Sequence, residues 1–92
     1  MGKITREEAL AILMAENPSR RHVVEMYLGC FFTYLEAQDN IERNGAIVAH
    51  PRTGTPIENP YLKVRSEAMK DMRKLALKGL DKLWAAVYKD KE

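Results

Sequence analysis

Few side chains in this 92-residue chain could do covalent or metal chemistry: His22, Cys30, Glu36, Asp39 and His50. Cys30 falls in an apolar helical stripe, where a cysteine is usually a small core residue. Two distant histidines and one cysteine lack the close ligand pairs of a zinc site. Glu36 and Asp39 share a helix face, but such pairs are common on solvated helices. The pattern therefore predicts no catalytic centre, no metal and no cofactor.

Contact with phosphate groups through lysine and arginine is the other chemistry open to the chain. The net charge is only +2, yet residues 61–82 carry seven basic residues against three acids. Lys63, Lys70 and Lys74 fall within about 40° of one another on a helical wheel, away from the apolar seam. A solvated helix face is the alternative for any single lysine. The candidate nucleic-acid contacts are Arg20, Arg21, Arg52, Lys63, Arg65, Lys70, Arg73, Lys74 and Lys78.

Two long segments around a breaker-rich connector must position these cations. Residues 44–60 hold three of the four prolines and two of the five glycines. This arrangement predicts an all-α fold built on a long antiparallel helical hairpin. We expect its arms at 18–44 and 60–79 and a connector at 45–59, which can form a small β-hairpin. Gly79 is expected either to end the second arm or to kink it.

A short helix is expected at each end of the hairpin. Thr5 and Glu8 have the spacing of a capping box, which predicts a helix within residues 1–17. Asn17 and Asn59 each stand between Glu and Pro, so both are expected to cap the helix that follows. Residues 80–92 are expected to form a short helix and a frayed tail. No signal peptide and no membrane span are apparent, so we expect one cytoplasmic domain over residues 1–92.

The first long helix carries more apolar circumference than one neighbour can cover. Its apolar arc spans well over half of the helix, against roughly 100° for an ordinary surface helix. The second arm covers one side, and the other is covered either by the short first helix or by another copy. Chains this short also gain stability from self-association. We expect a homo-oligomer, with a candidate interface at Val24, Leu28, Phe31, Phe32 and Leu35.

An ordered set of motifs resembles the small terminase subunit of tailed phages. The set covers roughly Val23 to Leu80 and comprises Tyr34-Leu35-Glu36-Ala37, Glu42-Arg43-Asn44-Gly45, Ile47-Val48, Gly54, Asn59-Pro60, the Ala68, Leu75 and Ala76 seam, and Gly79-Leu80. That family usually continues with Ser/Thr-Pro and an Arg-rich segment. Here Asp81-Lys82-Leu83-Trp84 follows instead, so the family's tail does not carry over to this chain.

The resemblance implies a non-enzymatic DNA-packaging protein. Small terminase subunits form rings through helical hairpins, hold double-stranded phage DNA at the start of packaging, and regulate the ATPase and nuclease of the large terminase subunit. The expected location is the cytoplasm of an infected or lysogenic bacterial host. Two alternatives stay open: a helix-turn-helix regulator over residues 9–27, or another small helical oligomeric module. An enzyme acting through Cys30, or through Glu36 and Asp39, is a third.

Overall fold

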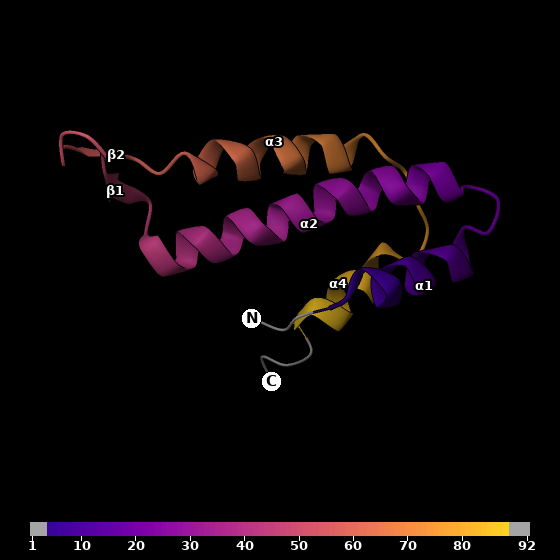
Figure 1. Cartoon of the computed structure of the whole chain (residues 1–92). Coiled ribbons are helices and arrows are strands. Elements are labelled where there is room, and N and C mark those ends of the chain that lie inside the picture. The colour runs from indigo at the N-terminus through magenta and orange to yellow at the C-terminus, as the bar shows by residue number, and fades with distance from the viewer. Residues whose placement is uncertain (1–3, 89–92) are drawn as a thin grey trace.

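The computed structural model describes residues 4–88, in which three helices pack around a fourth, α2, and a small sheet lies at one end (Figure 1). The helices are α1 (Arg6–Glu16), α2 (Arg21–Asn44), α3 (Tyr61–Arg73) and α4 (Leu80–Tyr88), and the strands are β1 (Ile47–Ala49) and β2 (Pro56–Glu58). The helical hairpin, its short flanking helices and the β connector are confirmed. The tail expected at residues 89–92 lies outside the described part.

Local sequence explains how α1 starts. The backbone N–H of Glu8 donates to Thr5 Oγ1 at 3.1 Å, and the Thr5 N–H donates to Glu8 Oε1 at 3.2 Å. This reciprocal pair satisfies two of the N–H groups that a helix start leaves without partners. The predicted capping box is therefore confirmed.

The connector reverses the chain through two glycines and a short antiparallel ladder. Gly45, at φ 86°, ends α2, and its N–H bonds to the Ile41 carbonyl at 2.7 Å. The strands pair Val48 with Ile57, and Gly54 turns the chain between them at φ 72°. Positive φ is a conformation that glycine adopts without the steric cost of a Cβ. These turns return the chain along α2 as α3.

The core lies between α2 and the layer formed by α1 and α4. Figure 1 shows α4 beside α1, with α2 between this layer and α3. The fully enclosed side chains include Leu13 from α1, Phe31 from α2 and Leu83 from α4. The Trp84 ring meets Phe31 edge-on at 4.9 Å between centroids, and Trp84 Nε1–H donates to Tyr27 Oη at 3.1 Å. Aromatic contacts of this kind fix α4 on α2.

This packing shows what covers the second apolar side of α2, for which the sequence offered either the short first helix or another copy. Val24, Leu28 and Phe31 have no exposed area, Leu35 is 8% exposed, and Phe32 is partly buried. The cover comes from the chain itself, because α1 and α4 together pack on this side of α2 (Figure 1). Four of the five residues assigned to a subunit interface are therefore buried and Phe32 is only partly exposed, so the periodicity argument for self-association loses its premise.

The second arm is also shorter than expected. α3 ends at Arg73 in a tightened turn, where the N–H groups of Lys74 and Leu75 bond three residues back, to Asp71 and Met72. The chain then leaves the helix so that Leu75, Leu77 and Leu80 reach the core. Gly79, at φ 78°, neither ends nor kinks α3; its carbonyl accepts the first hydrogen bonds of α4. Within residues 4–88, no helix is both long and apolar enough to cross a membrane.

Candidate nucleic-acid interface

The outward face of α3 carries three of the predicted cations together. Lys63, Lys70 and Lys74 are exposed, and none of these side chains forms an ion pair with a residue between 4 and 88. At about 1.5 Å per residue they extend over roughly 16 Å of helix. Lys70 and Lys74 also lie at the C-terminal end of α3, where the helix dipole favours positive charge. The three lysines therefore form an exposed cationic row that can contact anions.

The arginines of α3 are engaged within the protein. Arg65 Nη1 donates to Gln38 Oε1 of α2 at 2.7 Å, in a partly buried position. Arg73 Nη2 lies 3.6 Å from Met69 Sδ, so its guanidinium covers the thioether. Both side chains sit on the flank of α3 rather than on the lysine face. They are weaker candidates for phosphate contact than the lysines.

Arg52 lies in the turn between β1 and β2, at the end of the hairpin where α3 begins and carries Lys63. It is exposed, and its backbone N–H donates to His50 Nδ1 at 3.1 Å. The N–H of Gly54 bonds to the His50 carbonyl at 2.9 Å, which holds the turn in shape. The turn that carries the Arg52 guanidinium is therefore held by two hydrogen bonds of its backbone.

The remaining candidates lie at the opposite end of α2. Arg20 Nη1 donates to the Ala76 carbonyl at 2.6 Å, and Arg21 pairs with Glu25 at 3.5 Å. Arg20 and Lys78 line one open pocket between the α1–α2 turn and the segment that precedes α4. These three cations lie at the end of the hairpin where Lys74 follows α3, and Arg20 bonds to a carbonyl only two residues beyond Lys74. The hydrogen bond from Arg20 also joins the α1–α2 turn to the segment that follows α3, a role that the sequence did not predict.

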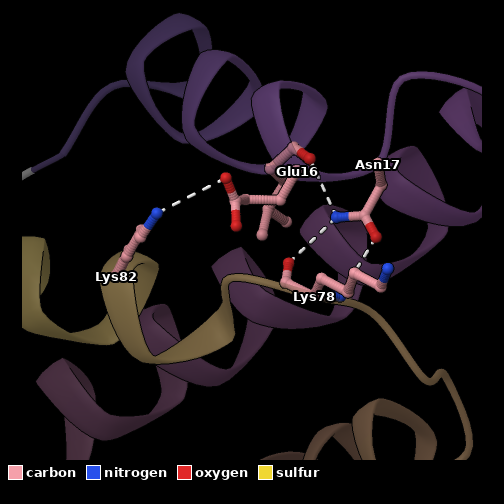
Figure 2. A network of polar contacts seen from close by, with 5 residues as sticks. Glu16, Asn17, Lys78 and Lys82 are labelled. Atoms are coloured by element: carbon pink, nitrogen blue, oxygen red, sulfur yellow. Dashed lines mark hydrogen bonds and ion pairs between the residues drawn. The ribbon is translucent and has the colours of Figure 1, made fainter.

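Asn17 has a structural role that the sequence did not reveal (Figure 2). Its Nδ2 donates to the carbonyls of Leu13 at 2.8 Å and Lys78 at 2.9 Å, and its Oδ1 accepts from the Lys78 N–H at 3.0 Å. The expectation that Asn17 caps the following helix was wrong, because α2 has Arg20 at its N-cap with no side-chain bond. Asn17 instead ties the end of α1 to the segment that positions α4.

Asn59 plays the matching role at the other end. Its Oδ1 accepts from the Tyr61 N–H at 2.9 Å. Asn59 lies one residue before Pro60, which occupies the N-cap position of α3. Its Nδ2 donates to Asn40 Oδ1 at 3.0 Å and to the Gly45 carbonyl at 2.9 Å. Asn17 and Asn59 are the buried polar residues of the described chain. The repeated Glu-Asn-Pro tripeptide was the signal that could have identified both.

Within residues 4–88, no hydrogen bond or ion pair joins the side chains with catalytic potential to one another. Burial, and secondly the charge of Asp71, raise the pKa of the Cys30 thiol, which disfavours the nucleophilic thiolate. Asp39 pairs with Arg43 at 3.1 Å, away from both histidines in sequence. Residues 4–88 contain no group of three or more His, Cys, Asp or Glu side chains placed to hold a metal ion.

Comparison with known proteins identifies the family. The model of the family described as "Phage terminase, small subunit" matches residues 7–78, from the start of α1 to the segment before α4. Searches of curated proteins and of solved structures gave no significant match. The match covers the whole helical hairpin with its connector and its lysine face. The chain therefore belongs to the phage terminase small-subunit family.

Proposed function

We propose that this protein binds double-stranded phage DNA as a homo-oligomer, in a ring, at the start of genome packaging. Membership of the small-subunit family gives the chain a general role in phage DNA packaging. The proposal adds that the protein is not itself an enzyme and that it regulates the ATPase and nuclease of the large terminase subunit. Its site of action is the cytoplasm of an infected or lysogenic bacterial host.

The observation that carries DNA binding is the unpaired lysine face of α3. Lys63, Lys70 and Lys74 have no carboxylate partner among the described residues, so their charge is available to phosphates. Three contacts from one subunit are weak, and an oligomer adds the contacts of its copies. Arg52, which lies in the turn between β1 and β2 at the end nearer Lys63, adds a further candidate contact. DNA contact is thus expected along α3 and the connector.

Salt dependence of DNA binding tests this proposal. The logarithm of the association constant should fall linearly with the logarithm of salt concentration, with a slope near −0.9 per neutralised phosphate. Replacing Lys63, Lys70 and Lys74 with glutamine should reduce that slope by about 3 per bound subunit and weaken binding to all sequences alike. Arg6→Gln is the matched control, because Arg6 already pairs with Glu25 at 3.7 Å. An unchanged slope in the triple variant would contradict the assignment.

A helix-turn-helix regulator receives less support from the geometry. Its recognition helix would be the start of α2, where Val24, Tyr27 and Leu28 are buried in the core. Arg20 and Arg21, the cations expected to read DNA there, are bonded within the chain. A footprint at one specific sequence by a dimer would favour this alternative over non-specific binding along α3.

A further inference from the structure

An apolar groove separates α2 from α3 on one flank of the hairpin. Its walls are Gly29, Cys30 and Thr33 of α2 and Val64, Glu67, Ala68 and Asp71 of α3. The groove is open above Gly29, because a Cβ added there would meet no atom within 4 Å. Val64 is 36% exposed, and Met26, one turn before Gly29 and Cys30, is 57% exposed. The flank therefore leaves apolar surface in water that the fold does not use.

The acids of this groove have no partner of opposite charge among residues 4–88. Neither Glu67 nor Asp71 forms an ion pair with a residue in the described range. The charge of Asp71 reaches the Cys30 thiol in the groove wall, whose pKa it raises after the larger effect of burial. An occupant of the groove would thus meet apolar walls with negative charge among them.

The opposite flank of α3 has the complementary character. At 100° per residue, Met69 and Arg73 lie about 160° around the helix from Asp71. Leu62 and Met69 are only partly buried there, and Arg73 is exposed and rests on the Met69 sulfur. This flank presents apolar side chains topped by positive charge. Such a surface fits a groove that is apolar and negative.

We propose that the groove of one copy receives the Met69 and Arg73 flank of a second copy, with Arg73 facing Asp71. The inference rests on the self-association in the proposed function and adds which surfaces meet. Because the two surfaces lie on opposite flanks of one helix, the contact is head-to-tail. Each added copy leaves a new groove free, and such contacts form a ring when the rotation closes. The lysine face of α3, between the two flanks, stays open for DNA.

This contact replaces the one expected from the sequence. The stripe from Val24 to Leu35 is covered by the chain's own α4, whereas Val64 and Met26 are exposed. It also assigns Arg73 to a subunit contact rather than to DNA. Both surfaces include residues of α3, so this helix contacts one neighbouring copy on each of its two flanks.

Charge reversal tests the inference through sedimentation of the full chain over a range of concentrations at low salt. Asp71→Lys and Arg73→Glu should each weaken self-association about tenfold or more, because each sets like charges against one another. The double variant carrying both changes should restore it to within about threefold of the parent. Restoration cannot arise inside one copy, since the two positions lie on opposite flanks. Glu42→Lys, an equal charge change at an exposed site outside both surfaces, should have no effect.

The possible outcomes separate this inference from the function on which it rests. A parent protein that assembles while both single variants assemble equally well would overturn the inference and leave the proposed oligomer intact. Single variants that fail without rescue in the double variant would also overturn it. A parent that stays monomeric at all concentrations would overturn the oligomer and the contact together. DNA binding is judged separately, by the salt slope.

Discussion

Replacing Asn17 with alanine should lower the free energy of unfolding by about 2–3 kcal/mol. The side chain is 5% exposed and makes three hydrogen bonds, to the Leu13 carbonyl and to both backbone groups of Lys78. Each bond contributes about 1 kcal/mol net, and the groups left without partners cost more where water cannot reach them. Lys78 is exposed, so water replaces part of the loss there. Alanine should therefore cost somewhat less than three full bonds plus desolvation.

Urea unfolding followed by far-UV circular dichroism measures this loss, and Trp84 fluorescence follows α4 in the same titration. Trp84 is the single tryptophan and lies on α4, whose position depends on the segment that Asn17 holds. A loss of 2–3 kcal/mol lowers the melting temperature of a domain this size by roughly 10–20 °C. Asn44→Ala changes an exposed asparagine and is the matched control. A midpoint for Asn17→Ala that equals the parent's would refute the assigned role.

Asn17→Asp sharpens the same test through pH. The new carboxyl would face the carbonyl oxygens of Leu13 and Lys78, which raises its pKa in the folded state above the unfolded value. A group with a raised folded pKa stabilises the fold below its unfolded pKa, and this stability is lost as pH rises through the folded pKa. The variant should thus be closer to the parent in acid than at neutral pH. An identical difference at both pH values would contradict the geometry.

Two further predictions concern backbone space and a buried phenol. Gly79→Ala should lower the free energy of unfolding by about 1–3 kcal/mol, because φ is 78° and the new Cβ would lie 2.6 Å from Glu16 Cγ. Gly29→Ala, where a Cβ meets no atom within 4 Å, should instead stabilise α2 by about 0.5–1 kcal/mol. Thermal melts of the two variants test both predictions. Burial raises the pKa of Tyr27 against the smaller, lowering effect of the Trp84 hydrogen bond. The fold should therefore lose stability as pH rises past the ordinary tyrosine pKa near 10 towards the folded value. Trp84→Phe should raise the pKa of Tyr27 further in an ultraviolet titration, and a fall would contradict the assigned bond.

Local signals predicted the elements well because their causes are local. Thr5 and Glu8 make the capping box that their spacing indicates, and Gly45 and Gly54 take the positive φ values that end α2 and turn the connector. These outcomes depend on a few neighbouring residues. The hairpin follows from them without knowledge of the rest of the chain.

The errors concern contacts between distant segments. Periodicity located the apolar face of α2 but could not say that Leu83 and Val87, more than fifty residues after Val24, would cover it. The end of α3 was missed for the same reason, since Leu75 and Leu77 leave the helix to reach the core. Sequence also cannot separate free cations from engaged ones. Arg20 and Arg65 are held by oxygen atoms of remote residues, whereas Lys70 has no such partner among residues 4–88.

The fold and the proposed DNA contact should respond differently to ionic strength, because the two buried asparagines that join segments of the fold carry no charge. Neutral amide hydrogen bonds hold the end of α1 to the segment before α4 and the end of α2 to the start of α3, and dissolved ions screen interactions between charges far more than bonds between neutral groups. Phosphate contacts, in contrast, are displaced by competing counterions. A wash at high salt concentration should remove bound nucleic acid from the purified protein, whereas the hydrogen bonds of Asn17 and Asn59 should persist.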